Sequence, residues 1–458
     1  MPIASINPTT GATFAEFAEH DAHEVDARIG AAQNAFHALS GTDFATRARW
    51  MRSAADLLDA DVDAVAELIT REMGKTLAQA RGEVHKSAKA MRFYADNAET
   101  FLSGSALDDP SAVGATAART VYQPLGVVLA VMPWNYPIWQ VVRFAAPALM
   151  AGNTGLLKHA SNVPQSALYL DSLFERGGFP AGSFGSLLIS AGEVEGVIRD
   201  RRVVAVTLTG SEPAGRSVAA IAGSEVKHVV LELGGSDPFI VMPSADLDAA
   251  VAAAVASRTA NNGQACINAK RFIVHADIHD AFVEKFAAAM GALRVGDPLD
   301  ERTEVGPLAT STGRAELAEL VEDALTAGAR AVTGGRSPDG DGWFYPPTVL
   351  TDVTDRMRLY REEAFGPVAA VYHATDAADA LRIANDTTFG LSSAVWTEDA
   401  AEEALLTAGL QAGAVFINGM SVSYPELPFG GIKDSGVGRE LSAEGIREFC
   451  NLKSIWKA

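Results

Sequence analysis

The chain has 458 residues, and 57 acidic against 37 basic side chains give it a net charge of −20. This length predicts two or three structural units, and the negative field disfavours nucleic acid and anionic membranes as partners. An anionic ligand would need local cations. Two cysteines give no disulfide framework, and the N-terminus has no basic stretch before an apolar one. We therefore expect a cytoplasmic protein.

The first quarter of the chain has a helical pattern. Residues 21–103 are rich in Ala, Leu, Arg and Glu, with apolar side chains three to four positions apart over 43–68. A break of small residues follows at 103–118. The next segment, GVVLAVM at 126–132, is short, apolar and β-branched, which predicts a buried strand.

Strand and helix patterns then alternate, which predicts a parallel sheet with helices on both faces. The first set of strands is expected at 153–159, 184–190, 203–210 and 228–235, with helices at 165–178, 194–200 and 212–223. The second set has helices at 246–260 and 279–293, and strands at 270–276, 368–374, 391–397 and 413–419. A terminal strand over 449–458 is expected to pair outside its own domain, with another subunit as one option.

Polar residues stand where four of the predicted strands end. They are Asn135, Lys158, the pair Gly210 and Ser211 before a helix, and Glu232. Ligands of open α/β sheets bind at the carboxyl ends of strands. Asn135 could donate to an oxyanion, Lys158 could meet a ribose or phosphate, and Glu232 could act as a general base. Each also has an ordinary reading, such as a turn asparagine or a solvated lysine.

Cys266 lies in the segment NNGQACIN at 261–268. Most free cysteines are small buried hydrophobes, and a reactive thiol needs a partly open, electropositive site. Spacing alone therefore does not separate a structural Cys266 from a nucleophile.

Seven segments in order resemble the aldehyde dehydrogenase superfamily. They are PWN (133–135), LLKHAS (156–161), TGSEPAG (209–215), LELGG (231–235), NNGQAC (261–266), EEAFGPV (362–368) and PFGGIKDSG (428–436). Within the superfamily, KHASNVP at 158–164 and GMSVSYPELPFGG at 419–431 resemble bacterial succinate-semialdehyde dehydrogenases.

The resemblance implies an α/β fold with a Rossmann-type parallel-sheet cofactor domain, an α/β catalytic domain and a small β element for bridging and oligomerisation. The expected boundaries are 1–105 and 123–233 for the dinucleotide-binding domain, 234–435 for the catalytic domain, and 106–122 with 436–458 for the bridging element. A homodimer, or a homotetramer built from dimers, is implied. No metal site is expected.

The resemblance also assigns catalytic roles. Cys266 attacks the aldehyde carbon, Asn135 holds the oxyanion, and Glu232 activates water to hydrolyse the thioester that hydride transfer leaves. Cys450 matches no catalytic position. The residues that match the dinucleotide cleft are Trp134, Lys158, Ser161, Gly210, Ser211, Glu363 and Phe365.

Ser161 bears on the choice of cofactor. Many NAD-preferring members of the superfamily carry a glutamate at this position, three residues after the lysine. A carboxylate would repel a 2′-phosphate, whereas a serine beside Lys158 would not. We therefore expect NADP, with NAD possible if Ser161 merely permits both.

Three residues are expected to bind the substrate. Trp139 and Arg143 share a face of the helix after Pro137, and Ser423 lies in the loop before PFGG. An arginine in an apolar tunnel needs an anion, and the carboxylate of succinate semialdehyde is one. The alternative is that Arg143 pairs with a protein carboxylate.

Other functions stay open at this point. Another ω-carboxylate or aliphatic aldehyde would use the same chemistry. A CoA-acylating enzyme would not need Glu232 to activate water. A catalytically silent, oligomeric binding protein would have no need of Cys266, Glu232 and Asn135 together.

Overall fold

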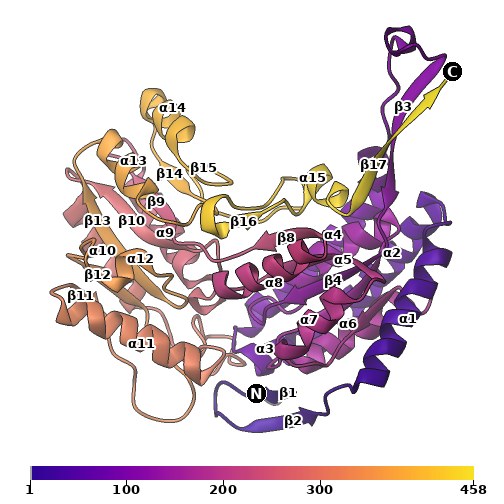
Figure 1. Cartoon of the computed structure of the whole chain (residues 1–458). Coiled ribbons are helices and arrows are strands. Elements are labelled where there is room, and N and C mark those ends of the chain that lie inside the picture. The colour runs from indigo at the N-terminus through magenta and orange to yellow at the C-terminus, as the bar shows by residue number, and fades with distance from the viewer. Residues whose placement is uncertain (1–2) are drawn as a thin grey trace.

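The computed structural model describes residues 3–458 and contains two large sheets (Figure 1). A small hairpin opens the chain, formed by β1 (Ile3–Ile6) and β2 (Thr13–Phe17). Four helices follow: α1 (Ala22–Leu39), α2 (Phe44–Ala60), α3 (Val62–Met73) and α4 (Leu77–Phe101). The predicted helical region is confirmed, and the sequence pattern missed the hairpin.

Capping residues explain where these helices begin. Asp21 and Glu24 form a reciprocal capping box before α1, and the side chains of Asp43 and Thr76 accept from backbone N–H groups at the starts of α2 and α4. The left-handed Gly74 ends α3. The four helices are therefore separated by local signals in the sequence.

The first large sheet has six strands in the order β16-β8-β7-β4-β5-β6. All neighbours are parallel except β16 on β8. Its chain order reverses between β4 and β7, which is the place where open α/β sheets bind ligands. The strands are β4 (Val127–Met132), β5 (Thr154–His159), β6 (Phe184–Ser186), β7 (Val203–Thr209), β8 (His228–Glu232) and β16 (Gly436–Val437).

Helices cover both faces of this sheet, as predicted (Figure 1). The helix α5 is buried along its whole length, which explains its lack of a polar face. The helices that follow the strands are α5 (Trp139–Ala151), α6 (Pro164–Arg176), α7 (Val194–Arg199) and α8 (Glu212–Ser224).

The second large sheet has seven strands in the order β11-β12-β13-β10-β9-β14-β15, parallel except for β11 on β12. Its strands are β9 (Asp237–Val241), β10 (Ala269–His275), β11 (Arg330–Thr333), β12 (Thr348–Thr351), β13 (Val368–Ala374), β14 (Ala394–Trp396) and β15 (Phe416–Ile417). Its helices are α9 (Leu247–Thr259), α10 (His279–Gly291), α11 (Ser311–Thr326), α12 (Arg358–Arg361), α13 (Ala377–Asn385) and α14 (Ala400–Gly409). The expected α/β class is confirmed for both sheets.

A two-stranded ribbon projects from the body and carries the C-terminus (Figure 1). The chain returns to it through α15 (Ser442–Arg447), and β17 (Cys450–Lys457) pairs antiparallel with β3 (Ala117–Pro124). The terminal strand therefore pairs within its own chain, with the segment next to the small-residue break. Within residues 3–458, no helix is long and apolar enough to cross a membrane.

Candidate active site

Cys266 lies on a loop between α9 and β10. The loop opens with a short 3-10 turn, Ala260–Gly263, in which Asn261 and Asn262 adopt left-handed backbone conformations with φ of 56°. Asparagine tolerates this conformation better than most residues. The loop can therefore turn sharply enough to present Cys266, which is partly exposed.

Two buried cations hold the backbone of this loop. The Lys270 Nζ donates to the carbonyl oxygens of Ala265 and Cys266, at 3.0 and 2.7 Å, and lies 3.1 Å from a carboxylate oxygen of Glu363. Arg258, fully buried, donates to the carbonyls of Gly263 and Ala269 at the two ends of the loop. We refer to Lys270 and Arg258 as the loop clamp. Sequence reasoning missed both, because a basic side chain that binds carbonyls has no spacing signature.

The glycines of the LELGG segment allow the close approach of this loop. A Cβ on Gly235 would lie 2.8 Å from the Cys266 carbonyl oxygen, and one on Gly234 would lie 2.6 Å from a Glu363 carboxylate oxygen. Only glycine fits such contacts without a shift of the neighbours. The segment thus brings the strand end that carries Glu232 against the loop that carries Cys266.

Burial favours the neutral forms of the two groups expected to carry the chemistry. It raises the pKa of the Cys266 thiol to about 12, against the opposing effects of the Arg143 and Lys270 charges. Burial and the nearby Glu440 carboxylate raise the pKa of Glu232 well above its usual range. Within residues 3–458, neither Glu232 carboxylate oxygen has a hydrogen-bond partner. A thiol in this state needs a base, and Glu232 could act as one only in its ionised form.

Asn135 is fixed beside the loop that carries Cys266. Its side-chain N–H donates to the main-chain carbonyl of Gln264 at 3.0 Å, and the main-chain carbonyl of Asn135 accepts from the Asn261 side chain at 2.8 Å. The amide nitrogen has a second hydrogen, which these contacts leave free. Asn135 is therefore a preorganised donor, fixed to the loop two residues before Cys266.

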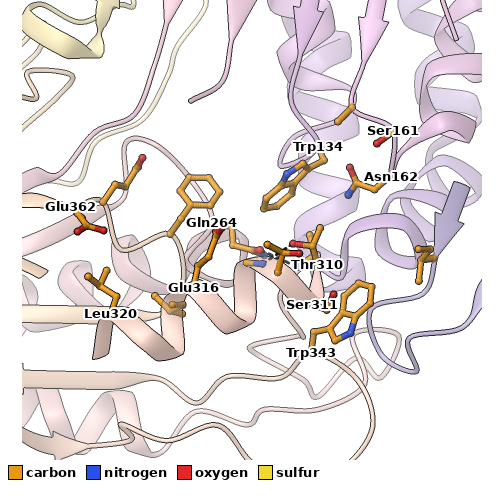
Figure 2. Close-up of a pocket in the computed structure, with 18 of the residues that line it drawn as sticks. Trp134, Ser161, Asn162, Gln264, Thr310, Ser311, Glu316, Leu320, Trp343 and Glu362 are labelled. Carbon is orange, nitrogen blue, oxygen red and sulfur yellow. Dashed lines mark hydrogen bonds between the residues drawn. The ribbon is translucent and has the colours of Figure 1, made fainter. Parts of the chain in front are cut away.

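A cavity of about 790 Å³ opens where β4 and β5 end (Figure 2). Of the residues predicted to bind the cofactor, Trp134, Lys158, Ser161, Glu363 and Phe365 line it. The rings of Trp134 and Phe365 meet edge to face with centroids 5.7 Å apart. Gly210 and Ser211 lie at the end of β7, outside this lining. Their part in cofactor binding stays a prediction.

The cavity has the polar groups that a phosphorylated dinucleotide requires. Burial lowers the pKa of Lys158, and no carboxylate within residues 3–458 forms an ion pair with its ammonium. Ser161 lines the same cavity, and Asn162 has a side-chain nitrogen without a partner in the described chain (Figure 2). The start of α11, at Thr310 and Ser311, faces the same space.

A second, smaller cavity of about 110 Å³ lies on the other side of the nucleophile loop. Cys266 lines it together with Trp139, Arg143 and Ser423, the three residues predicted to bind substrate. Gln264, two residues before Cys266, lines the larger cavity. The loop therefore separates the two cavities, with the thiol facing the smaller one.

Arg143 has a protein anion, as the alternative reading of the sequence allowed, although it still lines the small cavity. Arg143 is 2% exposed and forms an ion pair with the buried Glu440, which comes from the far end of the chain. It also donates to Thr209 and lies over the ring of Phe429. Sequence reasoning missed another cation in this wall, Lys86 of α4. Its place in a helical pattern gave no sign that it faces Cys266.

Comparison with known proteins identifies the family of this chain. The model of the aldehyde dehydrogenase family matches residues 1–455. The chain is 62% identical to succinate-semialdehyde dehydrogenase [NADP(+)] 1 of Mycobacterium tuberculosis, over 100% of both chains, and 61% identical to succinate-semialdehyde dehydrogenase [NADP(+)] of Mycobacterium leprae, also over 100% of both. The structure of succinic semialdehyde dehydrogenase from Streptococcus pyogenes in complex with NADP+ superposes with a TM-score of 0.96 at 36% identity, over 99% of both chains. The chain belongs to the aldehyde dehydrogenase family.

Proposed function

We propose that this protein oxidises succinate semialdehyde to succinate with NADP as the oxidant. The observation that carries the proposal is the position of the nucleophile loop, with Cys266 in the wall of a small cavity and Gln264 in the wall of a cavity of dinucleotide size. Full-length identity of 62% to an enzyme named for this substrate and cofactor supports the choice of both.

The larger cavity would hold the cofactor through residues already described. Lys158 and Ser161 would meet the adenosine phosphate and ribose, and Glu363 and Phe365 would meet the nicotinamide end. When bound, NADP accepts the hydride that leaves the substrate carbon. The absence of a carboxylate at position 161 removes the repulsion that would select against a 2′-phosphate.

The first covalent step belongs to Cys266. Glu232 takes the thiol proton, and the sulfur adds to the aldehyde carbon to give a thiohemiacetal. The negative charge moves to the former carbonyl oxygen, where the free N–H of Asn135 donates to it. After the carbon is oxidised, Cys266 carries a succinyl thioester.

The second step needs a base again. After Glu232 has released the thiol proton to solvent, it removes a proton from water, whose oxygen attacks the thioester carbon, and Cys266 leaves as thiolate and takes this proton back from Glu232. The raised pKa of Glu232 suits both transfers, because a carboxylate with higher proton affinity is a stronger base. Water as the acyl acceptor distinguishes this reaction from a CoA-acylating one.

We also propose that the chain forms a homodimer through the projecting ribbon. Leu452 and Trp456 on β17 are more than half exposed, although both are large and apolar. Leu452→Glu should shift the mass measured by light scattering towards that of a monomer. An unchanged mass would place the interface elsewhere.

Initial rates of NADPH and NADH formation test the proposed reaction. Succinate semialdehyde, a longer ω-carboxylate semialdehyde and butanal are each assayed with NADP and with NAD. We expect the highest kcat/KM for succinate semialdehyde with NADP, no dependence on CoA, and no turnover by Cys266→Ala. Equal rates with butanal would overturn the substrate, and equal rates with NAD would overturn the cofactor preference.

A further inference from the structure

The helix α5, which contributes Trp139 to the wall of the small cavity, is capped by a residue of another helix. It begins after Ile138, whose side chain cannot accept a hydrogen bond. Glu83 of α4 supplies the acceptor instead, because one of its carboxylate oxygens accepts the backbone N–H groups of Ile138 and Trp139 at 2.8 and 2.9 Å. A residue 55 positions before Ile138 therefore fixes the first turn of α5.

Lys75 holds this carboxylate from the other side. Its Nζ donates to the second carboxylate oxygen of Glu83 at 2.5 Å and lies 3.8 Å from the centroid of the Tyr136 ring. Both charged side chains are fully buried. We refer to Lys75 and Glu83 as the anchoring pair. Its contacts lie on the residues that follow Asn135 in the chain, from the Tyr136 ring to the start of α5.

The connection between α3 and α4 also contacts the loop that carries Cys266. The Gly74 carbonyl accepts from the Asn262 side chain at 2.7 Å, and the Gln79 side chain accepts the backbone N–H of Asn261 at 2.5 Å. One short part of the chain therefore contacts both the loop of the thiol and the segment that follows the expected oxyanion donor.

We propose that Glu83, held by Lys75, is a positioning residue that keeps the Asn135 side chain where the aldehyde oxygen becomes negative. Tyr136 and Trp139 line the small cavity, whereas neither member of the anchoring pair does, so the pair acts through the segment 135–139. This inference rests on the proposed function, because Asn135 has this task only if an oxyanion forms.

The position of Asn135 depends on contacts on both sides of it. Its side chain donates to the main-chain carbonyl of Gln264 at 3.0 Å, and the anchoring pair fixes the residues that follow. An oxyanion donor must lie about 3 Å from the oxygen that it stabilises. A displacement of about 1 Å in such a group can lower the rate by about 100-fold. Loss of the acceptor at the start of α5 would leave two buried N–H groups unpaired, which favours such a displacement.

The test replaces both members of the pair, because the removal of one would leave a buried charge. Burial lowers the pKa of Lys75, and the Glu83 carboxylate opposes this effect. Lys75→Met with Glu83→Gln, the acceptor variant, retains an oxygen for the N–H groups of α5. Lys75→Met with Glu83→Met, the acceptor-free variant, has a side chain of similar shape and no such oxygen.

Initial rates with succinate semialdehyde and with butanal compare the two variants. We expect kcat and kcat/KM of the acceptor-free variant to be about 10- to 100-fold lower than those of the acceptor variant, because the oxyanion contact is made in the transition state. Equal values for the two variants would overturn the proposal. If the acceptor-free variant does not fold, Glu83→Asp decides, since it keeps the charge beside Lys75 but reaches less far towards α5. Its kcat should fall by about 10-fold, and an unchanged kcat would overturn the proposal.

A double-mutant cycle shows whether the effect passes through Asn135. In an Asn135→Ala background, the acceptor-free and acceptor variants should differ in kcat by less than about threefold, because the donor that Glu83 positions is gone. An undiminished difference in that background would overturn the proposal. Asn135→Ala with wild-type turnover would overturn the oxyanion role in the proposed function, and this inference with it, so the two failures are distinguishable.

Alkylation of Cys266 by iodoacetamide separates positioning from general damage to the site. This reaction displaces iodide from a saturated carbon and forms no oxyanion. Its rate should therefore be similar in the acceptor-free and acceptor variants, although their turnover differs. Alkylation that slows by the same factor as turnover would overturn the proposal.

Glu72 provides a matched control. It is also a fully buried carboxylate that caps a distant helix, since it accepts the backbone N–H groups of Gln165 and Ser166 at the start of α6. Glu72→Met should be less stable than Glu72→Gln in urea, whereas kcat at saturating NADP should agree within about threefold. A loss of kcat in Glu72→Met as large as that in the acceptor-free variant would overturn a specific role for Glu83.

Discussion

Replacing Gly235 by alanine tests whether backbone packing positions the nucleophile. The new Cβ would lie 2.8 Å from the Cys266 carbonyl oxygen and 3.0 Å from an Asp237 carboxylate oxygen. An unstrained contact needs about 0.5 Å more. The carbonyl cannot move back freely, since the Lys270 Nζ holds it at 2.7 Å. The loop that carries the thiol must therefore shift.

The expected cost follows from that displacement. A shift of about 1 Å in a reacting group can lower the rate by about 100-fold, so we expect kcat of Gly235→Ala to fall by about 10- to 100-fold. Overpacking should also lower the free energy of unfolding by about 1–3 kcal/mol. Initial rates at saturating substrate measure the first effect, and denaturant unfolding measures the second.

Gly223→Ala is the control for the glycine substitution itself. Gly223 lies in α8, and a Cβ added there meets nothing within 4 Å. Its kcat should be unchanged, and alanine in a helix should stabilise the protein slightly. The rate at which iodoacetamide inactivates each variant reports on the exposure of Cys266. A Gly235→Ala enzyme with kcat and unfolding free energy equal to those of wild type would refute the packing argument.

Three further substitutions test other parts of the site. Ser161→Glu should lower kcat/KM with NADP by about 10- to 100-fold and kcat/KM with NAD by less, since the new carboxylate repels a 2′-phosphate. An equal loss of kcat/KM with both cofactors would contradict this reasoning. Lys270→Met should lower the free energy of unfolding by about 3–5 kcal/mol, because it leaves three carbonyls and the Glu363 carboxylate without their cation, and urea unfolding measures this. Glu440→Gln should lower the pKa of Glu232, because the Glu440 carboxylate raises it. The limb of the kcat–pH profile that reports the ionisation of Glu232 should therefore move to lower pH. A shift of this limb to higher pH would contradict the effect assigned to Glu440.

The order of strands and helices was accessible from the sequence because each element carries a local signal. The apolar segment before Pro133 is β4, and the Ala-rich segment after Asp246 is α9 with Asp246 as its cap. The N-terminal hairpin was missed, since the alternation in Thr13–Phe17 is short and largely exposed. Local patterns identify elements best where burial is continuous.

The ion-pair partners of charged side chains could not be predicted from local sequence patterns. Arg143 lines the small cavity together with Trp139 and Ser423, the other two residues predicted to bind substrate. Its anion, Glu440, is brought to it only by the return of the chain along β16 and α15. Lys86 was missed for the same reason, since its neighbours Trp139 and Ser423 come from two other parts of the chain.

The loop clamp has a consequence for how enzymes of this shape can change substrates. Lys270 and Arg258 grip main-chain carbonyls, which every amino acid possesses. The side chain at Ile267, next to the nucleophile, takes no part in that grip and lies in the wall of the small cavity. A substitution at Ile267 can therefore change the shape of the cavity wall without moving the Cys266 sulfur. Substrate specificity can therefore change in such an enzyme while the catalytic residues keep their positions.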